Sequence, residues 1–76
     1  MDENQFVDIA GLIGEPARAK MLWNLLDGRA YTASELAMAA DISGTSASNH
    51  LTKLLGGRLA ESRKTRKTPV FFFFKA

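Results

Sequence analysis

The segment from Asp41 to Leu55 constrains the fold of this 76-residue chain more than any other part. Its apolar residues Ala47, Leu51 and Leu54 recur at helical spacing, so they can share one buried face. Ser43 suits the N-cap position, where a hydroxyl accepts a bond from an unpaired backbone N–H. The segment therefore predicts a turn followed by an amphipathic helix.

The remaining surface of that helix carries short, uncharged donors and acceptors, with one lysine near its end: Thr45, Ser46, Ser48, Asn49, Thr52 and Lys53. Such side chains can lie close to a duplex and bond to base edges and phosphate oxygens. The helix N-terminus that Ser43 caps also favours a phosphate, because it carries partial positive charge. A plain core helix is the alternative, but Ser and Thr are mediocre helix formers and their number then has no explanation.

The net charge of +2 hides an asymmetry along the chain. Residues 1–41 hold three basic and seven acidic side chains, a balance of −4, whereas residues 42–76 hold seven basic and one acidic, a balance of +6. The basic half contains the polar-faced helix, and clustered positive charge is the electrostatic footprint of nucleic-acid binding. A membrane-surface patch would instead need aromatic and basic residues on one amphipathic helix.

The length fits one small domain over residues 1–76, whose core is marginal and is expected to need a partner chain. The absence of cysteine excludes disulfides and thiolate metal sites, and is compatible with a reducing cytoplasm. The acidic, polar N-terminus is unlike a signal peptide, and no apolar run is long enough to span a bilayer. We expect a cytoplasmic protein without a membrane partner.

Helical periodicity precedes the polar-faced helix, and extended periodicity follows it. Pro16 suits the first turn of a second helix and Gly28 its end, with Trp23 expected in the core. Thr32 and Glu35 have the spacing of a capping box. The predicted elements are helices over residues 4–13, 16–27 and 33–39, the polar-faced helix ending at Gly56-Gly57, and strands over residues 59–63 and 70–75.

The two strands would enclose a hairpin tip over residues 64–69, in which Pro69 suits the start of a strand. Beside a polar-faced helix, the basic side chains of this hairpin fit the phosphate backbone: Arg63, Lys64, Arg66 and Lys67. A helix, a short turn and a second helix that is polar outward form a helix-turn-helix. The predicted fold class is mainly α with a small β-hairpin.

Three stretches resemble the ArsR family of winged-helix bacterial repressors. Residues 12–22, Leu-Ile-Gly-Glu-Pro-Ala-Arg-Ala-Lys-Met-Leu, are similar to that family's Leu-Gly-Asp-Pro-x-Arg opening, and Glu35-Leu-Ala37 is similar to its third helix. Residues 42–54, Ile-Ser-Gly-Thr-Ser-Ala-Ser-Asn-His-Leu-Thr-Lys-Leu, resemble a recognition helix that typically reads Leu-Ser-x-Ser-x-x-Ser-x-His-Leu-x-x-Leu. Together the stretches and the hairpin cover about residues 9–75.

The resemblance implies a winged helix-turn-helix in which the hairpin is the wing. It also implies a homodimer that binds double-stranded DNA at an operator and blocks transcription, often until an inducer of unknown identity releases it. Carried over by position, the recognition-helix contacts to DNA would come from Thr45, Ser46, Ser48, Asn49 and His50. The wing contacts would come from Arg63, Lys64, Arg66 and Lys67.

Three features depart from the family pattern. Many metal-responsive members carry Cys-x-Cys in the third helix, where this chain has Leu36-Ala-Met-Ala-Ala40, so that thiolate site is absent. Members usually continue past the wing into a helix that completes the dimer, and this chain ends at Ala76. Phe71-Phe-Phe-Phe74 also replaces the usual alternation of aromatic and polar residues in the second wing strand.

The four phenylalanines bear on the oligomeric state. Successive side chains of a strand point to opposite faces, so Phe72 and Phe74 would be exposed on a lone monomer and form an apolar patch. The first helix offers a second apolar surface through Phe6, Ile9 and Ile13. We expect a two-fold homodimer built from the first helix and the final strand.

The sequence offers little for catalysis or cofactor binding. His50 is the only histidine, and a Ser–His pair would also need an orienting acid and an oxyanion site. There is no phosphate-binding GxxxxGK[ST] motif, and one histidine without cysteine cannot form the usual zinc site. We therefore expect no catalytic residues, metal or cofactor. The alternative to DNA binding is a winged-helix module for protein–protein interaction with an incidental basic wing.

Overall fold

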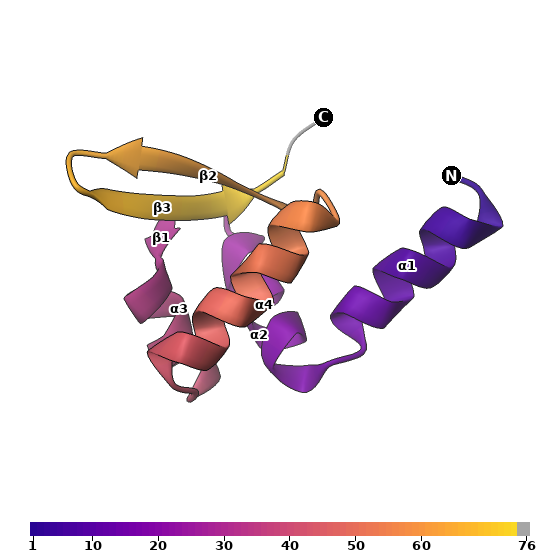
Figure 1. The fold of residues 1–76 in the computed structure, drawn as a ribbon, viewed down its shortest axis with the longest axis horizontal. Coiled ribbons are helices and arrows are strands. Elements are labelled where there is room, and N and C mark those ends of the chain that lie inside the picture. Colours follow the sequence, from indigo (N-terminus) through magenta and orange to yellow (C-terminus); the bar gives the residue numbers. More distant parts are fainter. Residues whose placement is uncertain (75–76) are drawn as a thin grey trace.

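The computed structural model describes residues 1–74, which form four helices and a small sheet (Figure 1). Three of the helices pack together, the sheet lies along one side of them, and the first helix projects from the opposite end. The elements are α1 (Glu3–Ile13), α2 (Pro16–Leu25), β1 (Tyr31–Thr32), α3 (Ala33–Ala40), α4 (Gly44–Gly56), β2 (Ala60–Thr65) and β3 (Thr68–Phe73). This architecture confirms the predicted mainly α fold with a β-hairpin wing.

Side-chain caps start α3 and α4 where the sequence predicted them. Thr32 accepts a hydrogen bond from the backbone N–H of Glu35 at 3.1 Å, and the Glu35 carboxylate accepts one from the Thr32 N–H at 2.8 Å. The Ser43 hydroxyl accepts from the N–H of Ser46 at 3.1 Å. Each cap satisfies N–H groups that have no partner inside the helix, which typically stabilises a helix by about 1 kcal/mol.

The turn between α3 and α4 sets the angle of the helix-turn-helix. Asp41 ends α3 in the left-handed conformation, with φ of 56°, which Asp tolerates better than most residues. The backbone N–H of Ile42 then donates to the carbonyl of Ala37 at 3.0 Å. Ile42 packs against the core, so the turn is held by a side chain as well as by the backbone.

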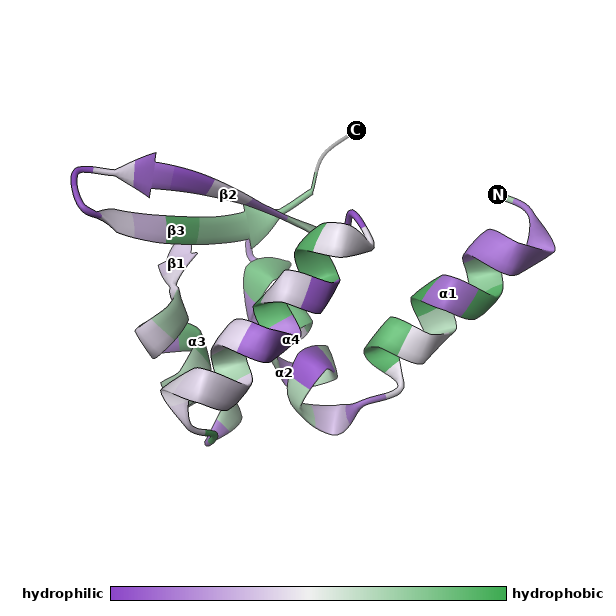
Figure 2. Ribbon diagram, viewed as in Figure 1, coloured by the Kyte–Doolittle hydropathy of each residue, from purple (hydrophilic) through white to green (hydrophobic). Residues whose placement is uncertain are grey.

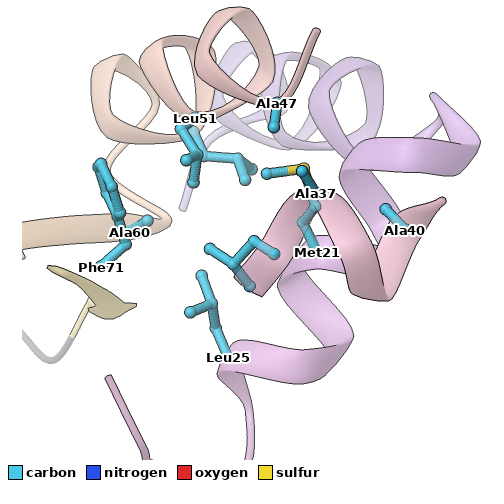
Figure 3. Packing of buried hydrophobic residues seen from close by; sticks show 10 residues of the cluster. Met21, Leu25, Ala37, Ala40, Ala47, Leu51, Ala60 and Phe71 are labelled. Carbon is cyan, nitrogen blue, oxygen red and sulfur yellow. The ribbon is translucent and has the colours of Figure 1, made fainter. Parts of the chain in front are cut away.

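One apolar core joins α2, α3, α4 and the sheet, and Figure 3 shows its side chains converging from these elements. Small alanines between the larger side chains allow the helices to approach closely. Each large side chain that is fully buried contributes roughly 1.5–3 kcal/mol of transfer free energy. The buried residues are Met21, Leu25, Leu36, Ala37, Ala40, Ala47, Leu51, Leu54, Ala60 and Phe71.

The orientation of α2 differs from the prediction. Its buried face carries Arg18, Met21 and Leu25, whereas Trp23 lies on the opposite side and is 76% exposed. The prediction that Trp23 belongs to the core is therefore wrong. Apolar residues occur on more than one side of α2, so periodicity alone could not select the face, and the flexible Met21 side chain fills the core position. The helix also ends at Leu25, two residues earlier than predicted, before Gly28 with its φ of 84°.

The sheet is antiparallel with the order β1-β3-β2, and its hairpin is tighter than predicted. The strands run to Thr65 and resume at Thr68, so only Arg66 and Lys67 lie in the turn, and the predicted tip over residues 64–69 is too long. Thr65 and Thr68 pair across the turn, and the Thr65 hydroxyl donates to the Thr68 carbonyl at 3.3 Å. The predicted end of the second strand at Lys75 lies outside the described residues.

The phenylalanine alternation is confirmed, but the expected exposure of two rings is wrong. Phe71 is buried and Phe73 packs against the core, while Phe72 and Phe74 are half-buried. The Arg63 guanidinium lies 5.7 Å from the centroid of the Phe72 ring and covers it. Phe72 and Phe74 also line a shallow hollow between the wing and the C-terminal end of α4.

The helix α1 stands apart from the body, which is formed by α2, α3, α4 and the sheet, and none of the residues of α1 is buried. Phe6 is 63% exposed and Ile13 is 42% exposed. Figure 2 shows apolar residues along α1 where it projects from the body. Its contact with the body is concentrated at its C-terminal end, where Leu12 lies so close to Gly57 that a Cβ there would clash with it.

Candidate nucleic-acid interface

The helix α4 presents a polar face directly opposite its buried face. At 3.6 residues per turn, Thr45, Asn49 and Thr52 lie across the helix from Ala47 and Leu51. All three polar side chains are exposed, whereas both apolar ones are buried. The arrangement leaves two hydroxyls and one amide pointing away from the core.

Local hydrogen bonds decide what these side chains still offer. The Ser43 hydroxyl is occupied as the cap of α4, which fixes the start of the helix. The Thr52 hydroxyl donates to the carbonyl of Ser48 at 2.9 Å, so its lone pairs remain as acceptors. Ser46 is half-buried, while Ser48 and Lys53 are exposed on either side of the polar face. Thr45 and Asn49 thus form the centre of the face.

His50 does not join this face, which corrects the expectation carried over from the family. Its side chain is only 19% exposed and points toward α2. The ring Nδ1 lies 3.1 Å from Nη1 of Arg18, and Nε2 lies 3.2 Å from Oε2 of Glu15. Both ring nitrogens are therefore occupied by partners inside the protein.

The wing carries its four predicted basic side chains on different surfaces. All four are exposed: Arg63, Lys64, Arg66 and Lys67. Paired residues of an antiparallel ladder share a face, and Arg63 pairs with Val70 while Lys64 pairs with Pro69, so these two point to opposite faces of the hairpin. Arg66 and Lys67 form the tip of the hairpin.

The wing is rich in basic side chains, whereas α1 carries acidic ones. The tip of the hairpin and the N-terminal end of α4 both lie toward one end of the long axis, and α1 lies at the other (Figure 1). The helix α1 and its cap carry Asp2, Glu3 and Asp8 without a basic residue. The basic side chains of the wing therefore lie away from the acidic end of α1, while Asp41 lies just before the N-cap of α4.

Glu15 and Arg18, which the sequence analysis did not single out, both contact His50 of α4. Glu15 caps α2 by accepting bonds from the N–H groups of Ala17 at 3.0 Å and Arg18 at 3.1 Å. The bond from Ala17, together with that from Arg18, holds the pKa of the Glu15 carboxyl below its ordinary value of 4.5. An acid directly before a proline at the first helical position is a capping signal that the sequence did contain.

The described part of the chain gives little sign of other kinds of site. Within residues 1–74, no group of three His, Cys, Asp or Glu side chains is arranged to hold a metal ion. Across the same range, no helix has the length and apolar character needed to cross a membrane.

Comparison with protein families supports the assignment made from the geometry. A family model for the helix-turn-helix domain matches residues 13–63, which run from the end of α1 into the wing. An uncharacterized HTH-type transcriptional regulator of Bacillus subtilis (strain 168), YdfF, is 43% identical over 56 residues. The match covers 74% of this chain but 25% of YdfF, so the chain spans about a quarter of the length of that relative.

Solved structures agree on the fold. HlyU from Vibrio cholerae superimposes with a TM-score of 0.86 at 25% identity, covering 99% of this chain and 83% of HlyU. A homodimeric winged helix-turn-helix DNA-binding domain from Mycobacterium bovis, Mb0332, described as a possible ArsR-family regulator, gives 0.85 at 21% identity and covers 95% and 66%. The resemblance to ArsR-family proteins is thus confirmed for the fold, and the chain belongs to the helix-turn-helix domain family.

Proposed function

We propose that this domain binds double-stranded DNA sequence-specifically as the reading unit of a transcription regulator that blocks transcription at an operator. The observation that carries the proposal is the face of α4: short hydrogen-bonding side chains lie opposite the core, beside a basic hairpin. Charged, flexible side chains fill an ordinary solvated face, whereas this face suits close approach to base edges.

In the proposed complex, α4 enters the major groove. Asn49 is suited to a bidentate bond with adenine, and Thr45 can contact a base edge or a thymine methyl group. Ser46, Ser48 and Thr52 flank this centre with hydroxyl groups. No step requires catalysis, a metal or a cofactor.

The phosphate contacts surround this reading face. The N-terminus of α4, capped by Ser43, presents unpaired N–H groups and partial positive charge to one phosphate. Lys53 lies on the same helix, and the wing adds the tip residues Arg66 and Lys67 with Arg63 and Lys64 on its two faces. These contacts would position the domain without reading sequence.

The proposal includes a two-fold dimer through α1. The exposed Phe6, Val7 and Ile13 would be covered by the same surface of a second copy, because a two-fold interface pairs like with like. Two recognition helices about 34 Å apart would then meet successive turns of a palindromic site. Sedimentation at micromolar concentration tests this element, and a monomer that occupies a palindrome one-to-one would exclude the dimer.

The experiment that tests DNA binding starts from a randomised duplex library, from which the whole chain selects sites at low salt. Affinity for the selected site is then measured by fluorescence anisotropy across a salt series. The expected result is an enriched motif and a linear fall of log K with log salt, since phosphate contacts release counterions. Lys53→Ala should weaken binding, whereas Lys20→Ala, an exposed lysine on α2, should not. No enriched motif and no salt dependence would overturn the proposal.

A second candidate function has one observation in its favour. Trp23 is 76% exposed and Leu26 52% exposed on the outer side of α2, which is a typical hot-spot chemistry for protein partners. In that case the domain would be a protein–protein module. Binding that is insensitive to salt and abolished by Trp23→Ser but not by Asn49→Ala would favour this alternative.

A further inference from the structure

Arg18 is the buried charged residue of the described chain, only 9% exposed, and it connects two helices. Its Nε donates to the Leu12 carbonyl at 2.7 Å, and Nη2 approaches the Gly11 carbonyl at 3.4 Å. These carbonyls belong to the last turn of α1, which has no basic residue of its own. The guanidinium therefore caps the negative end of α1 from a position on α2.

The same guanidinium also contacts α4, the recognition helix. Nη1 of Arg18 lies 3.1 Å from Nδ1 of His50 on α4. Arginine has donors only, so Nδ1 must accept, and the ring proton of neutral His50 then sits on Nε2. From there it points at Oε2 of Glu15, 3.2 Å away, and Glu15 caps α2. The result is one continuous path of hydrogen bonds from α1 through Arg18 and His50 to α2.

Few other contacts fix the direction of α1. No residue of α1 is buried, and its main neighbour among the elements is α2. Near α4, the only close packing described is that of Leu12 against Gly57. These attachments all lie at the C-terminal end of α1, so a rotation about that end would move the N-terminal end of α1 most.

We propose that Arg18 and His50 are positioning residues that set the angle between α1 and α4, and thereby the half-site spacing that a dimer accepts. This inference rests on the proposed function for the spacing, but the angle itself does not depend on DNA. A planar guanidinium bound to both helices suits the role, because its donors have fixed directions.

The length of α1 makes its angle consequential. Its 11 residues form a rod about 16 Å long, so a swing of about 10° at the base moves the far end by about 3 Å. That displacement is close to the rise of one base pair of DNA. A dimer formed through α1 would carry such a swing directly into the separation of its two recognition helices.

The angle can be measured directly because the chain has no cysteine of its own. Spin labels are placed on Asn4→Cys in α1 and Lys53→Cys in α4, both exposed positions, and the labelled chain is diluted with unlabelled protein. Double electron–electron resonance then gives the distance distribution within one chain. The substitutions to compare are Arg18→Met and His50→Leu, with Lys20→Met as a matched control on the outer side of α2.

The expected result is a narrow distribution for the parent and Lys20→Met, and a broadened or displaced one for Arg18→Met and His50→Leu. His50→Asn should retain most of the parent distribution, because its amide oxygen can accept from Arg18 where Nδ1 did. Cooperative thermal unfolding by circular dichroism checks that each variant is folded. Should Arg18→Met fail to fold, the pair His50→Leu and His50→Asn decides the matter alone.

The consequence for DNA is tested on the site selected by the parent protein, with its central spacer lengthened or shortened by one base pair. The parent should bind the altered spacers about tenfold more weakly, because one half-site loses its specific contacts. That ratio should fall toward one in His50→Leu and be restored in His50→Asn, while affinity for an isolated half-site changes little.

The outcomes separate the two proposals. Unchanged distance distributions in both Arg18→Met and His50→Leu would overturn the positioning role, whatever the protein binds. Broadened distributions in a protein that selects no DNA would uphold the positioning role and overturn the proposed function. A spacing ratio that His50→Leu leaves at the parent value would overturn the link between the angle and the operator.

Discussion

The body and α1 both carry apolar helical surface, yet only the body buries it. Every buried apolar side chain among residues 1–74 comes from α2, α3, α4 or the wing. The helix α1 leaves Phe6 at 63% exposure and is attached through Arg18 and Leu12 at its base. The difference teaches that the reading face is held by core packing, whereas the surface proposed for the dimer depends on polar attachments and on a partner.

The largest expected effect comes from a cavity in the body. Leu51 is 1% exposed, and Leu51→Ala should lower the free energy of unfolding by about 2–5 kcal/mol in urea denaturation. The same truncation at Leu26, which is 52% exposed, should cost less than about 0.5 kcal/mol. Phe6→Ala in α1 should behave like Leu26→Ala in the monomer while weakening self-association. An equal loss at Leu51 and Phe6 would erase the distinction between body and α1.

The next effect concerns the centre of the reading face. Asn49→Ala removes one amide and should cost about 1–3 kcal/mol in binding the selected DNA site, with relaxed preference at one base pair. The stability of the fold should hardly change, because Asn49 is exposed and opposite the core. Asn4→Ala, the same truncation in α1, is the matched control and should leave DNA affinity unaltered. Anisotropy titrations that give Asn49→Ala the parental preference would refute its assignment to base reading.

A smaller and less selective effect is expected at the wing tip. Arg66→Gln with Lys67→Gln should weaken binding to all DNA sequences alike and reduce the slope of log K against log salt by about two. The paired control, Lys20→Gln with Arg29→Gln, makes the same charge change in the acidic half of the chain. If both double variants lowered the slope equally, net charge rather than wing placement would explain the binding.

The sequence predicted the helix-turn-helix well because its signals are local. Thr32 and Glu35 could be identified as a capping box, and Ser43 as a cap, without knowing what they pack against. The spacing of Ala47 and Leu51 also fixed the buried face of α4, since the opposite side held only polar residues. Where one face is apolar and the other is not, periodicity has a single solution.

The predictions for Trp23 and His50 failed because tertiary contacts, rather than local sequence, determine where these side chains lie. The helix α2 is apolar on several sides, so only packing against the rest of the core could place Met21 inside and Trp23 outside. His50 lies at the border of α4, and its partners Arg18 and Glu15 are more than thirty residues away in sequence. No local pattern connects these residues. The family resemblance assigned His50 to a DNA contact, whereas in the structure its ring contacts Arg18 and Glu15.

The last and smallest effect is a pH dependence of stability that comes from Glu15, which lies between the end of α1 and the start of α2. The N–H of Ala17, followed by that of Arg18, holds the pKa of Glu15 below its ordinary value of 4.5. An acid whose folded pKa is lowered contributes stability above its unfolded pKa, and this contribution is lost as the pH falls through the folded value. Urea midpoints are therefore compared between the parent and Glu15→Gln from about pH 7 to about pH 3, both carrying His50→Asn, which removes the neighbour that pairs with Glu15. The parent should be the more stable above 4.5, and the difference should shrink below that pH. The distance distribution between the spin labels on α1 and α4 should broaden in the parent over the same acidic range. A difference that persisted undiminished at low pH would mean that Glu15 acts through packing rather than through its charge.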